Sequence, residues 1–162
     1  MVRIAITGGI ACGKSLVGSF FTARGIPVGD TDDWAHALIR KGQPVYRAVV
    51  KAFGRRILEP SGEIDRLVLG RQVFRDPAAR ARLNRLIHPA VRRVCARWLA
   101  RQKAARSPAA VVIVPLLYEA KMDRGWDAVI CVASPHRLQG QRLRARGLDP
   151  REAEARIAAQ MS

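Results

Sequence analysis

The pattern G-x-x-x-x-G-K-S, formed by Gly8, Gly13, Lys14 and Ser15, constrains the fold of this 162-residue chain more than any other feature. It stands between a short β-branched run at residues 2–7 and a segment whose apolar residues have helical spacing. In this context the pattern predicts a strand, a glycine-rich loop and a helix whose N–H groups cradle phosphate oxygens. We therefore expect Lys14 to reach the β and γ phosphates of a nucleotide and the Ser15 hydroxyl to hold Mg²⁺. The alternative is a glycine-rich turn that matches by accident.

Length and composition favour one compact domain with no membrane span. The longest apolar run, Ala109 to Tyr118, has ten residues, which is too short to cross a bilayer. Residues 1–7 lead directly into Gly8 and Gly9, so we expect no secretion signal. Cys12, Cys95 and Cys131 are odd in number and lack metal-ligand spacing. They indicate reduced thiols and a cytoplasmic location rather than a disulfide framework.

The formal net charge is +16, from 29 Lys and Arg against 13 Asp and Glu. Residues 77–118 contain no acidic residue. Arginines recur there near helical spacing, opposite apolar residues, at Arg85, Arg92, Arg93, Arg97 and Arg101. We interpret them as the solvated face of a long helix, which would also favour a polyphosphate ligand. Nucleic-acid binding is the other interpretation, but no recognition motif or aromatic stacking series accompanies the charge.

Short apolar runs alternate with helical stretches, which predicts an α/β fold with a parallel sheet flanked by helices. The helical stretch from Thr31 to about Arg106 has breaks at Gly42-Gln43-Pro44, Glu59-Pro60-Ser61-Gly62 and Asp76-Pro77. The expected strands are 2–7, 25–30, 111–114 and 128–132, and the other expected helices are 15–24, one from Ser134-Pro135 to about 146, and one from Asp149 or Pro150 through Gln160.

Acidic residues follow the second expected strand at Asp30, Asp32 and Asp33. The carboxyl ends of strands form the edge at which open α/β sheets bind ligands. A kinase needs a carboxylate there to orient or deprotonate the accepting hydroxyl. We assign that role to Asp32. The alternative is that one of these residues caps a helix starting near Trp34, and Asp33 is the better candidate for the cap.

Further segments resemble one family of phosphate-loop kinases. They are Thr7 to Ser15, Gly25 to Asp32, Phe74 to Pro77, Leu83 to Pro89, Val114 to Glu119, Arg142 to Arg146 and Arg156 to Met161. Their order along essentially the whole chain resembles the dephospho-CoA kinase family, whose members phosphorylate a ribose 3′-hydroxyl to finish coenzyme A. The phosphate loop alone is generic, but the Asp-x-Asp, His-Pro and Pro-Leu-Leu-x-Glu series together is specific.

The resemblance implies a role for each matching residue. Asp32 would act as the base on the 3′-hydroxyl, with Lys14 and Ser15 holding ATP and Mg²⁺. Either Arg142 or Arg146, in the lid, would close over the phosphates, although either could be a surface residue. The implied ATP-binding residues are Gly9, Ile10, Ala11, Cys12, Gly13, Lys14, Ser15, Leu16 and Arg146.

The resemblance also implies an acceptor site for dephospho-CoA. Its residues would be Asp30, Asp32, His88, Pro115, Leu116 and Glu119. By chemistry alone His88 could be a satisfied core histidine, and Glu119 an ordinary surface glutamate. We expect a P-loop kinase core at 1–30 and 109–134, a helical substrate-binding insertion at about 31–108, and a small lid at about 135–150, all forming a single domain over residues 1–162.

The chain departs from the family pattern in a few places. Thr31 separates the aspartates where alanine is usual, and Cys12 stands where serine or glycine is common. The family usually continues past Gln160 with another strand and a closing helix, which we expect to be absent. The alternatives are another small-molecule or nucleoside P-loop kinase, or a truncated nucleotide-binding protein without turnover. We expect a monomer or weak homo-oligomer that binds neither membrane nor nucleic acid.

Overall fold

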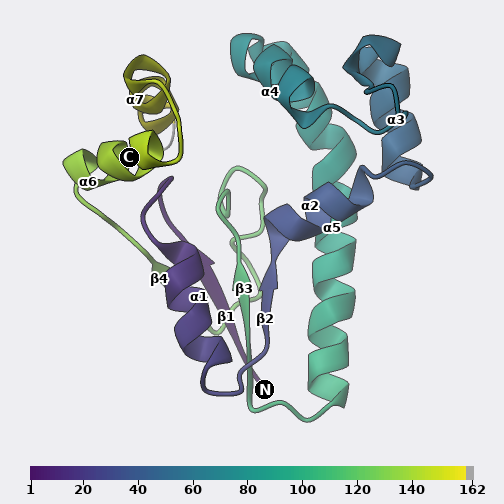
Figure 1. Ribbon diagram of the computed structural model, residues 1–162. Helices are drawn as coiled ribbons and strands as arrows, with labels where there is room; N and C mark the ends of the chain where they lie inside the picture. Colours follow the sequence, from purple (N-terminus) through teal and green to yellow (C-terminus); the bar gives the residue numbers. More distant parts are fainter. Residues whose placement is uncertain (160–162) are drawn as a thin grey trace. The chain divides into compact units, whose positions relative to one another are not determined.

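The structure, a computed structural model, describes residues 1–159 and divides into two units. One unit contains residues 1–30 together with the described residues from 98 onward, and the other contains residues 31–97. Figure 1 shows the order of the elements along the chain. Their bounds are β1 (Val2–Thr7), α1 (Lys14–Thr22), β2 (Val28–Asp30), α2 (Thr31–Leu38), α3 (Pro44–Phe53), the 3₁₀ turn η1 (Arg55–Ile57), α4 (Arg66–Arg75), α5 (Pro77–Ala104), β3 (Ala109–Ile113), β4 (Ala128–Cys131), α6 (His136–Ala145) and α7 (Pro150–Ala158).

The first unit is built on a parallel sheet with the strand order β2-β3-β1-β4. The register pairs Ile6 of β1 with Ile113 of β3 and Ile130 of β4. Residues 110–112 of β3 are completely buried, as expected for a central parallel strand covered on both faces. The parallel α/β sheet predicted from the alternating apolar runs is therefore confirmed.

Helix α1 packs against this sheet through a small apolar cluster. Val17 and Phe21 of α1 contact buried residues of β1 and β3, including Ile6 and Ile113. The approach is close at Gly18, where a Cβ atom would lie 2.9 Å from Cδ1 of Ile113. Glycine at this position lets the helix lie against the strand, and Figure 1 shows α1 beside the sheet.

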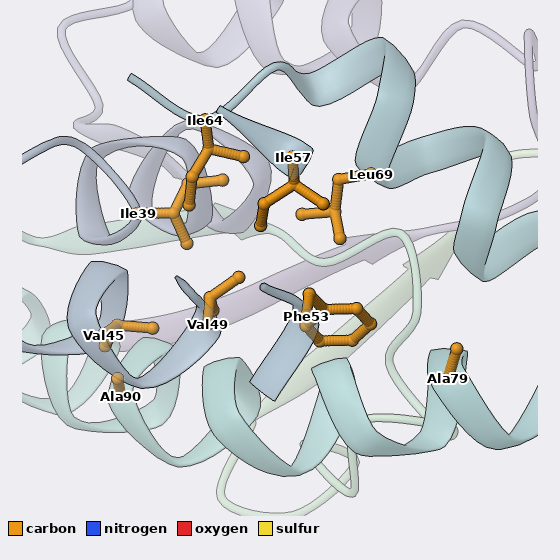
Figure 2. Close-up of a cluster of buried hydrophobic side chains, with 9 residues drawn as sticks. All are labelled: Ile39, Val45, Val49, Phe53, Ile57, Ile64, Leu69, Ala79 and Ala90. Atoms are coloured by element: carbon orange, nitrogen blue, oxygen red, sulfur yellow. The ribbon is translucent and has the colours of Figure 1, made fainter. Parts of the chain in front are cut away.

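The second unit has its own hydrophobic core, drawn in Figure 2. Val49 and Phe53 project from α3, and Ile57 is completely buried in the 3₁₀ turn. The remaining buried residues of this cluster are Ile39, Val45, Ile64, Leu69, Ala79 and Ala90. Because these residues come from α3, α4, α5 and the turns that follow α2 and α3, residues 31–97 form a compact helical unit.

Aspartate side chains cap two helices of the second unit, and one of them, Asp76, lies at a break that the sequence predicts. The Asp76 carboxylate accepts hydrogen bonds from the N–H groups of Ala78 and Ala79, at 2.8 and 3.1 Å. Asp65 caps α4 in the same way, accepting from Leu67 and Val68. These caps satisfy N–H groups that the first helical turn leaves without backbone partners.

Several predicted boundaries differ from the observed ones. The expected strand 25–30 begins only at Val28, because Pro27 offers the sheet just its carbonyl, which accepts from the Val111 N–H at 2.9 Å. The expected cap at Asp33 is wrong. Helix α2 starts at Thr31, directly after β2, so Asp32 and Asp33 lie inside its first turn, where the helix dipole favours acids. The expected end of α7 at Gln160 lies outside the described residues.

The predicted arginine face of α5 is confirmed by burial. All five arginines of the predicted face are exposed, whereas Leu83, Leu86, Val94 and Trp98 are half-buried.

Across residues 1–159, the structure contains no helix of the length and apolar character that a membrane crossing requires.

Candidate active site

The loop between β1 and α1 has a backbone shape that requires glycine. Gly8 has φ +134°, and a Cβ atom there would lie 2.0 Å from the carbonyl oxygen of Val132. Gly13 has φ +101° and forms the N-cap of α1. Side chains rarely adopt these backbone angles, so the two fixed glycines of the motif set the path of the loop.

The N-terminus of α1 is suited to an anion. Gly13 provides no side-chain cap, and the first turn of α1 contains no acidic residue. The Lys14 ammonium donates to the carbonyl oxygens of Gly8 and Gly9, at 2.8 Å each. Ser15 and Leu16 follow on the exposed side of the helix. The N-terminal end of a helix, with its dipole, and a lysine side chain therefore lie together at one loop.

Two side chains that follow β4 reach this loop. Arg142 Nη1 of α6 donates to the Ala11 carbonyl oxygen at 2.8 Å and to Ser134 Oγ at 3.1 Å. Ser134 Oγ in turn donates to the Cys12 carbonyl oxygen at 3.1 Å. The Arg146 side chain, at the exposed end of α6, has no hydrogen bond or ion pair with any residue from 1 to 159. Of the two arginines predicted to close over the phosphates, Arg142 is the one in contact with the loop.

Apolar packing holds the same two segments together. Buried Ala11 clusters with Leu143 of α6 and Ala153 of α7, and half-buried Ile10 packs against them. Ala11 has a φ of +56°, which is unusual for a residue with a side chain. The loop is therefore fixed by packing against α6 and α7 as well as by the hydrogen bonds of Arg142.

The predicted acceptor residues of the first unit lie at the carboxyl edge of the sheet. Asp30 ends β2 and pairs in register with Ile113, the last residue of β3. Pro115 follows β3, and its carbonyl oxygen accepts a long hydrogen bond from Thr7 Oγ1 at 3.5 Å. Leu116 and Glu119 are exposed in the turn that follows. This edge is where parallel α/β sheets bind ligands.

The predicted residues of the second unit lie on two helices. Asp32 is exposed in the first turn of α2. His88 is half-buried on α5, between residues that pack against the core of Figure 2. Both environments fit either the catalytic or the structural interpretation of these two residues.

Sequence reasoning missed two residues at the loop, Ser134 and Gln139. Gln139 Nε2 donates to Cys12 Sγ at 3.0 Å and to the Ser134 carbonyl oxygen at 3.1 Å. The only available signal was the position of Gln139, three residues before Arg142, which places both on one face of α6.

These features together define a class of protein. A parallel sheet, a glycine-rich loop, a lysine at the start of the following helix and an arginine from a later helix characterise P-loop phosphotransferases. Residues 2–162 match the sequence pattern of the dephospho-CoA kinase family. The chain belongs to this family, whose reaction is the ATP-dependent last step of coenzyme A biosynthesis.

Individual relatives agree with this assignment. The chain is 44% identical to a dephospho-CoA kinase of Anaeromyxobacter dehalogenans, over 98% of this chain and 75% of the relative. It is 46% identical to one of Symbiobacterium thermophilum, over 98% of this chain and 67% of the relative. The crystal structure of TT1252 from Thermus thermophilus superposes with a TM-score of 0.81 at 32% identity, covering 99% of this chain and 80% of that one. A dephospho-CoA kinase from Campylobacter jejuni superposes with a TM-score of 0.65 at 25% identity, covering 98% and 79%.

Proposed function

We propose that this chain transfers the γ-phosphoryl group of ATP to the 3′-hydroxyl of dephospho-CoA, with Asp32 as the base. The 3′-oxygen attacks the γ-phosphorus, and the bond from that phosphorus to the β–γ bridging oxygen breaks, releasing ADP. Asp32 accepts the proton that leaves the hydroxyl. The observation that carries this proposal is the convergence of Lys14 and Arg142 on one glycine loop in a member of this family.

The loop residues fit the phosphates of ATP. Residues 9–16 would surround the phosphates with backbone N–H groups, while Lys14 supplies a positive charge at the loop. Arg142 would bind the transferred group and stabilise the charge that develops on it. Arg146, which is exposed at the end of α6, would contact the solvent-facing side of the bound ATP.

Mg²⁺ would be held by the Ser15 hydroxyl together with phosphate oxygens. Among residues 1–159 there is no cluster of His, Cys, Asp and Glu that could hold a metal ion by itself. This agrees with the preference of Mg²⁺ for sites completed by substrate phosphates and water. When bound, the ion neutralises charge on the phosphates.

Asp32 is supported as the base by its position in the chain. It lies two residues after Asp30, the end of β2, and two residues span at most about 7 Å. It is exposed, so an acceptor hydroxyl can approach its carboxylate. Asp30, His88, Pro115, Leu116 and Glu119 would contribute to the acceptor site.

We also propose a cytoplasmic protein that is a monomer or weak homo-oligomer. Cys12, Cys95 and Cys131 are all free thiols, which suits a reducing compartment. Light scattering across a concentration series tests the oligomeric state directly.

A coupled ADP-release assay tests the proposed reaction. ATP, Mg²⁺ and the protein are combined with dephospho-CoA, with adenosine, or with no acceptor. We expect ADP release that depends on dephospho-CoA and is absent in the other two reactions. Release without an acceptor, or none with dephospho-CoA while ATP still binds, would contradict the proposal.

A further inference from the structure

A short hairpin in the second unit is held by hydrogen bonds to the segment that follows α2. Leu58 and Ile64 form an antiparallel bridge that closes the hairpin. The backbone N–H of Lys41 donates to Glu63 Oε2 at 2.9 Å, and the Lys41 ammonium donates to the Ser61 carbonyl oxygen, also at 2.9 Å. These bonds fix the hairpin against the segment that follows α2.

A pocket of about 390 Å³ lies between the hairpin and α2. Its apolar floor is Ile39 and Ile64, whose side chains are buried in the core drawn in Figure 2. Its polar lining is His36, Arg40, Glu59, Glu63 and Arg66. The volume is within the range of small-molecule sites, and a fixed wall of this kind is typical of a preformed one.

The charged side chains of this pocket differ in whether they have hydrogen-bond partners. The Glu63 carboxylate accepts from the Lys41 N–H, and Glu59 accepts from the Ser61 hydroxyl at 3.4 Å. Within residues 1–159, the guanidinium groups of Arg40 and Arg66 have neither a hydrogen bond nor an ion pair. The carboxylates are thus held by the hairpin itself, whereas two forked donors suited to phosphate oxygens remain available.

The pocket also lies at a defined position relative to Asp32. His36 is one helical turn after Asp32 and shares its face of α2, about 6 Å further along the axis. Arg40 follows the end of α2 in a turn, its N–H donating to the Ala37 carbonyl oxygen at 3.3 Å. The pocket therefore begins about one turn beyond the carboxylate to which we assign the acceptor hydroxyl.

An acceptor nucleotide matches this spacing. Its 3′-hydroxyl and its 5′-diphosphate lie on opposite sides of one ribose, so a 3′-oxygen at Asp32 places the diphosphate roughly one ribose away. We propose that this pocket binds the 5′-diphosphate of the acceptor, with Arg40 and Arg66 as its ligands and His36 beside them. The inference rests on the proposed function, because it takes Asp32 as the position of the reacting hydroxyl.

Kinetics of arginine variants test the inference. Arg40→Gln, Arg66→Gln and the double variant keep the aliphatic stems and remove the charges. We expect the KM for dephospho-CoA to rise at least about tenfold in each single variant and further in the double variant. The KM for ATP should stay within about twofold of wild type. Arg71→Gln, on the exposed side of the same helix α4 and outside the pocket lining, is the matched control and should leave both values unchanged.

The outcomes separate this inference from the proposed function. An unchanged KM for dephospho-CoA in a folded double variant, with wild-type turnover intact, would overturn the inference alone. If wild type shows no turnover with dephospho-CoA, the proposed function fails, and calorimetric titration of dephospho-CoA then decides the inference. Binding that the double variant loses supports it, and equal binding or no binding to wild type overturns it. Thermal melting of each variant verifies that it is folded.

Discussion

Arg142 donates a hydrogen bond to the carbonyl oxygen of Ala11, 131 positions earlier in the chain, over 2.8 Å. This contact joins helix α6 to the glycine loop and places a guanidinium group where nucleotide phosphates would bind. Arg146, the other arginine considered for this role, has no such contact among the described residues.

Replacement of Arg142 by Ala should therefore lower kcat by about 10²–10³-fold, because a donor to the transferred group is lost. Arg146→Ala is the matched control on the same helix and should change kcat by less than about threefold. Steady-state kinetics with ATP and dephospho-CoA measure both effects. A larger loss in the Arg146 variant would assign the catalytic role to that residue instead.

Gly8 is the loop position where a side chain should be least tolerated. Gly8→Ala would place a Cβ atom 2.0 Å from the Val132 carbonyl oxygen at a φ of +134°. We expect a loss of unfolding free energy of at least about 3 kcal/mol, beyond backbone strain alone. Gly25→Ala, at φ +72° with no atom within 4 Å of the added Cβ, should cost only about 1–2 kcal/mol. Denaturant melts of the two variants provide the comparison, and equal losses would contradict this account of the loop.

The sequence predicted the elements of the first unit well because each has a strong local signal. Residues 2–7 and 109–113 are rich in β-branched residues and are buried toward their carboxyl ends, and the glycine loop has a fixed pattern. The contact of Arg142 with Ala11 could not be predicted in this way. It depends on packing of Leu143 and Ala153 against the loop, which no local pattern encodes.

The start of α2 shows another feature that the sequence did not predict. Three acidic residues in four positions suggested a cap at Asp33, but the helix begins directly from β2 at Thr31. The chain can pass from strand to helix without a loop because buried Thr31 follows the sheet edge at once. The pocket at Arg40 and Arg66 was also beyond sequence reasoning, since a hairpin brings together residues 26 positions apart.

Stability should depend on pH through Asp127. The Asp127 side chain accepts hydrogen bonds from the Arg3 guanidinium and from its backbone N–H, which lowers its pKa to about 2. The pKa of an aspartate in the unfolded chain is about 3.9. The stabilisation by Arg3 is therefore fully present above pH ~4 and is lost as the pH falls through 2. Asp127→Asn should therefore lower the Tm at pH 7, and its difference from wild type should shrink between pH 4 and pH 2. Asp123→Asn, also exposed, is the control; a difference that is constant over this range would contradict the assignment.

The cysteines should differ in reactivity. Burial raises the pKa of the Cys95 thiol to about 11, so little thiolate forms near pH 8. Cys131 is exposed, whereas Cys12 and Cys95 are buried. Iodoacetamide at pH 8 should therefore modify Cys131 first and Cys95 only after unfolding, as followed by peptide mass spectrometry. Rapid modification of Cys95 in the folded protein would show that its surroundings are open to solvent.

Asp32→Asn tests the central claim most directly. Turnover of ATP with dephospho-CoA and calorimetric binding of a non-hydrolysable ATP analogue with Mg²⁺ are measured on the same preparations. We expect kcat to fall by about 10²–10⁴-fold while nucleotide affinity remains at the wild-type value. Asp33→Asn, the neighbouring acid in the same exposed turn, should keep nearly full turnover. Full turnover in the Asp32 variant would contradict the assignment of the base.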